Sequence, residues 1–342
     1  MTNLSIIVLA AGKGTRMKSD KAKVLHQVFH APMLHHVLAA VKPLKADKTI
    51  VVIGHQRDEV ERSLVGFDVE LGIQEKQLGT GHAVLCAEPL ITTEHGTIMI
   101  LCGDTPLIQS ATLEQMYQSH VDHGGPLTVM TTVLQTPTNY GRIISTDDEH
   151  ILAIVEEKDA NAEQKKITEI NTGIYCVEAD FLFQNLKNIG YDNSQKEMYL
   201  TDIVSIAVGQ NQPVAKYMTT RPQDVLGVNS RIELAEAHKE LQMRRNKQLM
   251  LAGITMHDPA TTSVAPEVTI GQDVILYPGV SLSGYCTVGE NCILHNGVIL
   301  KDSNLGINVC VGAYSYIEGS TIAAGTMIAP HTILGRADVP SH

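Results

Sequence analysis

A six-residue repeat in the last quarter of the chain limits its fold more than any other feature. From about Val264 onward, an aliphatic residue returns every six positions and is often followed by glycine or a small polar residue. Short strands spaced in this way bury their apolar side chains only when one coil stacks on the next. The repeat therefore predicts a hexapeptide β-helix rather than an ordinary antiparallel β-domain. The repeating positions are Ile270, Leu276, Leu282, Val288, Leu294 and Leu300 and, after a change of phase, Leu305, Val311, Ile317, Ile322 and Ile328.

The preceding part of the chain follows a different pattern, in which apolar strand candidates alternate with helix candidates. The clearest strands are residues 50–54, 69–73 and 98–101, and helical spacing runs over residues 32–41 and 111–119. This alternation is typical of an α/β fold with a mainly parallel, doubly wound sheet. Ligands of such sheets bind beyond the carboxyl ends of the strands.

Between these two regions, the composition changes to one rich in Glu, Leu, Ala, Lys and Arg. Asn229-Ser230 supplies a helix start signal and Gly253 a stop. A chain of 342 residues is long enough for two domains. We therefore expect an α/β domain over residues 1–228, a linker helix over residues 229–252 and a truncated β-helix domain over residues 253–342.

Charge and composition disfavour several classes of partner. The formal net charge of −11 repels nucleic acid and anionic lipid surfaces. No segment approaches the ~18 uninterrupted apolar residues of a membrane span, and the N-terminus has no signal-type pattern, so we expect a cytoplasmic protein. The six cysteines are scattered without a C-x-x-C pair. The i,i+4 pair His26 and His30 has no acidic partner, which disfavours zinc.

A glycine-containing loop after the first apolar strand carries the strongest functional signal. Glycines let backbone N–H groups approach phosphate oxygens, and five lysines and arginines follow within eleven residues of an acidic chain. This local reversal of charge favours a polyanionic small molecule over the alternative of a solvated turn. The loop reads Leu9-Ala10-Ala11-Gly12-Lys13-Gly14-Thr15-Arg16-Met17, with Lys18, Lys21 and Lys23 downstream.

Together with Lys23, this string resembles the signature of nucleotidyltransferases that make nucleotide sugars. It is most similar to that of the bacterial N-acetylglucosamine-1-phosphate uridylyltransferase family. The resemblance implies a Rossmann-like domain and a short left-handed β-helix. It also implies a homotrimer and a Mg²⁺-dependent reaction of UTP with N-acetylglucosamine 1-phosphate. The products would be UDP-N-acetylglucosamine, for peptidoglycan and lipopolysaccharide precursors, and pyrophosphate.

A second string, Gln74 to Ala83, contains two glycines that flank a threonine. Placed after a strand and before a helical segment at residues 83–87, it suits backbone contact with a base or a sugar. Alternatively, Thr80 caps the helix. The resemblance assigns the uracil nucleotide to this string and to the first loop, through Leu9, Ala10, Ala11, Gly12, Gln74, Gln77, Gly79 and Thr80.

A third string, Leu101 to Leu107, is an apolar strand that ends in Gly103-Asp104. A carboxylate at the end of a strand suits a Mg²⁺ ion, although Gly-Asp-x-Pro is also a common turn. The resemblance pairs Asp104 with Asn229 as the two protein ligands of the metal and places Gly103 and Asn229 at the substrates. In the sugar-binding half, it assigns the amino sugar to Gly141, Glu156, Asn171, Tyr199 and Thr201.

The chemistry expected of such a site needs no nucleophilic side chain. The phosphate of the sugar attacks the α-phosphorus of UTP, so catalysis consists of positioning and of positive charge. Arg16 and Lys23 would neutralise the phosphates. Two alternatives remain open at this point: a related enzyme that uses glucose 1-phosphate or another nucleotide, and a catalytically silent nucleotide-sugar-binding assembly protein.

The chain departs from the family pattern at several positions. Ala22, Cys102 and Leu226 stand where relatives often have proline, tyrosine and glutamate. The bifunctional members continue through further coils that carry an acetyltransferase site, whereas this chain stops soon after residues 328–336. We therefore expect acetyltransferase activity to be absent. His295, Lys301, His331 and Arg336 are the only basic residues in and just beyond residues 264–335, and none falls where the resemblance places a catalytic group.

Overall fold

The computed structural model describes residues 3–91, 96–146 and 150–335. The chain divides into two compact units, and helix α8, Arg231–Leu251, contributes to both. The first unit comprises Met1–Gln27 with Ala31–Glu233, and the second comprises Val28–His30 with Leu234–His342. Within the described ranges, no helix is long and apolar enough to cross a membrane.

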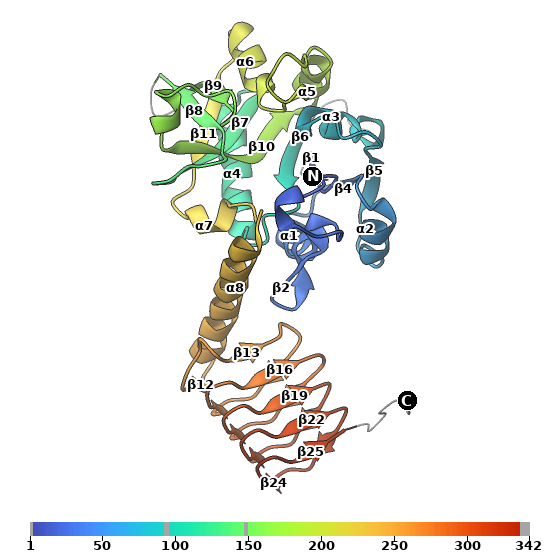
Figure 1. The fold of residues 1–342 in the computed structure, drawn as a ribbon, viewed down its shortest axis with the longest axis vertical. Coiled ribbons are helices and arrows are strands. Elements are labelled where there is room, and N and C mark those ends of the chain that lie inside the picture. Colours follow the sequence, from blue (N-terminus) through green and yellow to red (C-terminus); the bar gives the residue numbers. More distant parts are fainter. Residues whose placement is uncertain (1–2, 92–95, 147–149, 336–342) are drawn as a thin grey trace. The chain divides into compact units, whose positions relative to one another are not determined.

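The first unit is built on a nine-stranded sheet (Figure 1). Its strand order is β11-β7-β10-β6-β1-β4-β5, with β8 paired to β10 and β9 paired to β8. Pairs β1–β4, β1–β6, β4–β5 and β7–β11 are parallel, whereas β10 runs antiparallel to both neighbours on the main path. The strands are β1 Leu4–Leu9, β4 Lys48–Ile53, β5 Glu70–Ile73, β6 Thr97–Cys102, β7 Leu127–Val133, β8 Arg142–Ser145, β9 Ile151–Val155, β10 Glu169–Glu178 and β11 Val214–Met218.

Helices cover both faces of this sheet, because successive side chains of a strand point to opposite faces. Ile6 and Val8 of β1 belong to one apolar core, and the intervening Ile7 belongs to another. The first core includes α1, α2 and α4, and the second includes α3, α5 and α6. The expected doubly wound arrangement is thus confirmed. The helices are α1 Met33–Val41, α2 Arg57–Ser63, α3 Thr80–Leu85, α4 Ser110–His123, α5 Ala179–Leu186, α6 Asp202–Gly209 and α7 Pro222–Val225.

Helix α8 begins directly after Ser230, where a capping box closes its first turn. The Glu233 carboxylate accepts hydrogen bonds from the backbone N–H groups of Asn229 and Ser230, and the Ser230 hydroxyl accepts one from the Glu233 N–H. These contacts satisfy donors that a helix otherwise leaves unpaired. A long helix is thus found at Arg231–Leu251, within the segment 229–252 where the sequence predicts one. A two-stranded ribbon, β2 Gln27–Val28 and β3 Ala31–Pro32, lies earlier in the chain.

The second unit is the left-handed β-helix predicted from the six-residue repeat. Its short strands form three parallel sheets, β12-β15-β18-β21-β24, β13-β16-β19-β22-β25 and β14-β17-β20-β23 (Figure 1). The strands are β12 Thr255–Met256, β13 Ser263–Val264, β14 Thr269–Ile270, β15 Ile275–Leu276, β16 Ser281–Ser283, β17 Thr287–Val288, β18 Ile293–Leu294, β19 Ile299–Lys301, β20 Asn304–Leu305, β21 Cys310–Val311, β22 Tyr316–Glu318, β23 Thr321–Ile322, β24 Met327–Ile328 and β25 Ile333–Leu334.

The repeated aliphatic positions fill the interior of these coils, where Leu276, Leu294 and Val311 stack in one buried column. The change of phase after Leu300 has a simple geometric cause. Leu282 pairs with Leu300, 18 positions later, whereas Val288 pairs with Leu305, only 17 positions later. The corner between Leu300 and Leu305 is therefore a residue shorter, and so is the same corner one coil later, between Ile317 and Ile322. The coils stay in register in space although the sequence pattern shifts.

Candidate active site

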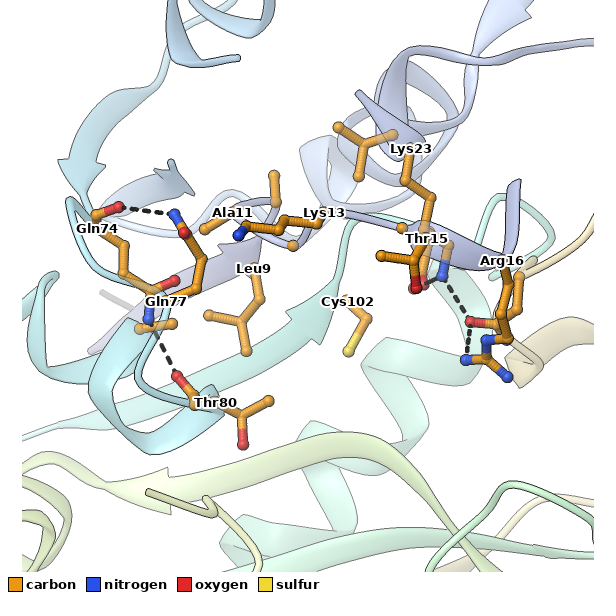
Figure 2. A pocket seen from close by; sticks show the side chains of 18 of the residues that line it. Leu9, Ala11, Lys13, Thr15, Arg16, Lys23, Gln74, Gln77, Thr80 and Cys102 are labelled. Carbon is orange, nitrogen blue, oxygen red and sulfur yellow. Dashed lines mark hydrogen bonds and ion pairs between the residues drawn. The ribbon is translucent and has the colours of Figure 1, made fainter. Parts of the chain in front are cut away.

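A pocket of about 530 Å³ opens beyond the carboxyl ends of the parallel strands β1, β5 and β6 in the first unit (Figure 2). The loops after β1, β5 and β6 line most of it, as the doubly wound topology predicts. The lining residues are Leu9, Ala10, Ala11, Gly12, Lys13, Gly14, Thr15, Arg16, Lys23, Val24, Gln74, Gln77, Gly79, Thr80, Ala83, Cys102, Asp104, Glu197 and Asn229.

The loop after β1 passes over the sheet and presents its backbone to the pocket. The Ala10 N–H donates to the carbonyl of Val52 at 2.8 Å, so the loop continues the β1–β4 pairing. Gly14 has φ +61°, and a Cβ there would lie 2.5 Å from the Cβ of Lys23. Only glycine fits this position without moving the lysine. A 3₁₀ turn, Thr15–Met17, then places Arg16 at the rim.

Two cations and two oxygen-bearing side chains converge at one end of the pocket. The Lys23 ammonium forms an ion pair with the Asp104 carboxylate and donates to Asn229 Oδ1 at 2.6 Å. Arg16 Nη2 donates to the same Oδ1 at 2.8 Å (Figure 2). The Asn229 amide nitrogen donates to the Gly227 carbonyl at 2.9 Å, which keeps its oxygen turned toward the cations.

This end of the pocket fits a divalent metal shared with phosphate. Asp104 and Asn229 already direct oxygens at a cation, the Lys23 ammonium, and a Cβ at Gly227 would come within 3.4 Å of Asp104 Oδ1. No group of three or more His, Cys, Asp or Glu side chains within the described ranges forms a closed metal site. Two protein oxygens leave most of an octahedral shell for phosphates and water.

The loop after β5 forms the other end of the pocket. The Gln74 N–H donates to the Ile53 carbonyl at 2.8 Å, and Gln77 Nε2 donates to the Gln74 carbonyl at 3.4 Å. Helix α3 begins at Thr80, three residues before the expected helical segment, and Gly79 occupies the N-cap position. Thr80 is therefore not the cap. Its hydroxyl instead accepts a hydrogen bond from the Leu200 N–H at 3.0 Å.

Three hydrogen bonds join the loop after β5 to a distant segment, residues 197–201. Besides the Thr80 contact, the Met198 N–H donates to the Leu78 carbonyl at 2.7 Å, and the Gly81 N–H donates to the Met198 carbonyl at 2.8 Å. A Cβ at Gly79, where φ is +115°, would lie 2.5 Å from the Met198 carbonyl oxygen. The loop that faces the base end of the pocket is thus linked directly to the segment that carries two of the expected sugar-binding residues, Tyr199 and Thr201.

Six of the expected site residues lie outside the pocket lining. Gly103 does not line the pocket, and its N–H donates a hydrogen bond to the Leu9 carbonyl at 2.9 Å. Gly141, Glu156, Asn171 and Thr201 form two hydrogen-bonded pairs. The Asn171 N–H donates to Gly141 at 2.9 Å, and the Thr201 hydroxyl donates to Glu156 at 3.4 Å. The sixth, the Tyr199 hydroxyl, accepts from Gln195 at 2.8 Å.

Electrostatic surroundings set the protonation of two groups near the pocket. Burial raises the pKa of the Glu156 carboxyl, and the hydrogen bond from Thr201 partly opposes this shift. Burial, followed by the charge of Asp104, raises the pKa of the Cys102 thiol to about 12. Cys102 therefore lines the pocket as a neutral thiol rather than as a nucleophile.

Several residues that line the pocket had no role predicted from the sequence. Lys13, Gly14 and Thr15 lie within the glycine loop and Ala83 lies within the second string, so their motifs already indicated the region. Glu197 begins the string Glu197 to Asp202, in which Tyr199 and Thr201 were assigned to the sugar, but it was given no role of its own. It reaches the pocket because the neighbouring Met198 is hydrogen-bonded to the loop after β5.

Comparison with known proteins agrees with both units. Residues 6–166 match the MobA-like NTP transferase domain, and residues 267–302 match the bacterial transferase hexapeptide of six repeats. The chain is 51% identical to a bifunctional protein GlmU of Desulfotalea psychrophila, over 95% of this chain and 96% of the relative. It is 43% identical to the protein of that name from Halalkalibacterium halodurans, over 99% of this chain and 74% of the relative. The chain therefore belongs to the family of the bifunctional protein GlmU.

Proposed function

We propose that the pocket of the first unit transfers a uridylyl group from UTP to N-acetylglucosamine 1-phosphate. The products are UDP-N-acetylglucosamine and pyrophosphate. Membership of the GlmU family makes the chain a nucleotidyltransferase that acts on a nucleotide and a sugar phosphate. The observation that carries the proposal is the convergence of Lys23, Arg16, Asp104 and Asn229 at one end of a pocket whose other end is lined by Gln74 and Gln77.

The residues of this end would act by position and charge. The phosphate of the sugar is already ionised, so the barrier lies in bringing anions together rather than in making a nucleophile. Lys23 and Arg16 would neutralise the phosphates that meet there, and the N–H groups of the loop after β1 would contact them. Held in place by Gly227, the Asn229 oxygen keeps both cations at the same point.

A divalent metal is expected of this family, and we propose that it is Mg²⁺, held by Asp104 and Asn229. Bound there, the ion would supply positive charge that offsets the negative charge of the reacting phosphates. The chain's own task is then to hold these two oxygens at the right spacing. The Asp104 carbonyl helps by accepting the Val228 N–H at 2.8 Å, which ties the two metal-binding segments together.

The base and the sugar would bind in two different regions of the site, which meet at the end that holds Lys23 and Asp104. We assign the uracil nucleotide to the loops after β1 and β5, and the amino sugar to the segments around Glu156 and Asn171. In the second region, hydrogen-bonding groups already point at one another. A sugar hydroxyl or N-acetyl group that replaces these contacts would be selected over an analogue that lacks it. The residues so assigned are Leu9, Ala10, Ala11, Gly12, Gln74, Gln77, Gly79 and Thr80 for the nucleotide, and Gly103, Gly141, Glu156, Asn171, Tyr199 and Thr201 for the sugar phosphate.

We further propose that residues 1–228 are the catalytic domain, residues 229–252 a linker helix and residues 253–342 an assembly domain that forms a homotrimer. A short solenoid gains stability when neighbouring copies cover its apolar surfaces. The reaction would take place in the cytoplasm, where UTP is available, without a nucleic-acid or membrane partner. Light scattering on the full chain tests the trimer, because a monomer mass at micromolar concentration would contradict it.

The substrate assignment is tested by pyrophosphate release from UTP in parallel reactions with N-acetylglucosamine 1-phosphate and glucose 1-phosphate. The proposal predicts that kcat/KM is higher for the N-acetylated sugar. Repeating the reaction with other nucleoside triphosphates tests the nucleotide. Equal or greater kcat/KM with glucose 1-phosphate would contradict the sugar assignment and leave the nucleotidyltransferase activity standing.

A further inference from the structure

The carboxamide of Gln74 is held at the base end of the pocket by two acceptors. Its nitrogen Nε2 donates to the Gly79 carbonyl at 3.0 Å and to His82 Nδ1 at 3.0 Å. A backbone carbonyl can only accept, so the atom that faces Gly79 is the amide nitrogen. Both amide hydrogens are therefore used within the protein, and the orientation of the carboxamide is determined by its neighbours.

The carbonyl oxygen of the same carboxamide is left for a ligand. Gln74 Oε1 has no protein hydrogen-bond partner within the part of the chain that the structure describes. Gln74 is only 3% exposed, and its side chain lines the pocket beside Gln77 (Figure 2). This oxygen is not fully shut off from the pocket, so a donor of a bound ligand can reach it. The base end therefore presents an acceptor.

His82 supplies the second of the two contacts from the first turn of α3. Its Nδ1 accepts from Gln74, so the ring proton lies on Nε2 in this arrangement. The next polar neighbour of Nδ1 is Cys86 Sγ at 3.9 Å, too distant to compete strongly. Without an acceptor at residue 82, one amide hydrogen of Gln74 loses its partner. The free-energy cost of the flipped carboxamide, in which Nε2 and Oε1 exchange places, then becomes smaller.

We propose that His82 is a positioning residue that fixes the carbonyl of Gln74 toward the pocket and thereby selects uracil over cytosine. Uracil carries an N–H at N3, which would donate to Oε1. Cytosine carries a lone pair at N3, which would face the lone pairs of Oε1. A site built around one such hydrogen bond discriminates against the base that lacks the donor. This inference rests on the proposed uridylyl transfer and adds the group that determines the base.

Binding of UTP and CTP to the full chain, measured by calorimetry with Mg²⁺ present, tests this role without depending on turnover. We expect the wild type to prefer UTP. His82→Phe keeps a ring but lacks the acceptor, and we expect it to lower the UTP-over-CTP affinity ratio about tenfold or more. His82→Asn places an amide oxygen where Nδ1 lies and should restore much of the ratio. His123→Leu, at the exposed end of α4, is the matched control and should leave the ratio unchanged.

Each result has a definite consequence. An unchanged ratio in folded His82→Phe would overturn the inference, as would a wild type that binds the two nucleotides equally. His82→Ala is a second acceptor-free variant, to be used if His82→Phe fails to fold. A wild type that prefers UTP in binding but releases no pyrophosphate would contradict the proposed function alone, and the role of His82 would then still be decided by the variants.

Discussion

The ammonium of Lys23 is paired with the carboxylate of Asp104, 81 positions further along the chain. Their side chains are 11% and 20% exposed, so both charges are largely removed from water. The loop after β1 and the end of β6 bring them together, because β1 and β6 are parallel neighbours in the sheet. Removing one partner leaves the other poorly compensated, which makes single substitutions here informative.

Lys23→Ala should lower kcat about a hundredfold or more, because a preorganised cation at developing charge is worth that much in similar sites. If the ammonium only helps bind phosphate, KM will rise instead and kcat will stay near the wild-type value. Initial rates of pyrophosphate release separate these outcomes. Lys18→Ala is a matched control, since Lys18 is exposed and lies outside the pocket lining. Wild-type kinetics in Lys23→Ala would remove the residue from the site.

Asp104→Ala should lower turnover by orders of magnitude and weaken metal binding while the protein stays folded. The substitution removes a charged metal ligand at the end of a strand and little apolar packing. Calorimetric titration with Mg²⁺ and activity at saturating Mg²⁺ measure the two effects, and circular dichroism checks the fold. Undiminished turnover at saturating metal would contradict the assignment of Asp104.

Glu156→Gln should stabilise the chain at neutral pH relative to the wild type. Burial raises the pKa of Glu156 in the folded state above its unfolded value, so its contribution to stability is fully present below the unfolded pKa. That contribution is lost as pH rises through the folded pKa, because the carboxylate must then be buried as an ion. The difference in Tm between glutamine variant and wild type should therefore be positive at pH 7 and shrink below about pH 4. A constant difference across this range would show that Glu156 titrates normally.

Thr80→Val should weaken the attachment of residues 197–201, which carry two expected sugar-binding residues, to the loop after β5, which faces the base end of the pocket. It removes the acceptor of the Leu200 N–H. Because Leu200 is only 3% exposed, this N–H is left without a partner, and we expect a loss of about 1–3 kcal/mol in the free energy of unfolding. KM for the sugar phosphate should rise with KM for UTP, because the segment of Tyr199 and Thr201 loses its anchor. Thr80→Ser keeps the hydroxyl and serves as the control. Equal stability and kinetics for both variants would show that the hydrogen bond between Thr80 and Leu200 contributes neither to stability nor to substrate binding.

The coils of the second unit should not transfer acetyl groups from acetyl-CoA to glucosamine 1-phosphate. Three of the four basic residues of these coils are engaged in contacts within the coils. Lys301 pairs with Glu318 at 2.7 Å, His295 stacks on Tyr277, and His331 stacks on Tyr314. Arg336 lies outside the described residues. Thiol release above background that is lost in His331→Ala would show that these coils contain a general base.

The elements that the sequence predicted best are those encoded by local pattern. The six-residue repeat specifies the coils because each short strand places its own aliphatic side chain in the interior. The shifts in the pattern reflect a corner that is one residue shorter in two successive coils. The interpretation of Thr80 as the helix cap was wrong, because its hydroxyl accepts from the Leu200 N–H, a donor 120 positions away in the chain. Glu197 was missed because backbone atoms, which carry no sequence signal, hold its segment against the loop after β5.

The most direct test of the central claim is a single incubation of the full chain with UTP, N-acetylglucosamine 1-phosphate and Mg²⁺. UDP-N-acetylglucosamine and pyrophosphate are quantified together in that reaction. We expect both products in equal amounts, no product in the presence of a metal chelator, and a rate lowered about a hundredfold or more in Lys23→Ala. Absence of the nucleotide sugar from the wild-type reaction, or its formation at an undiminished rate by Lys23→Ala, would contradict the account.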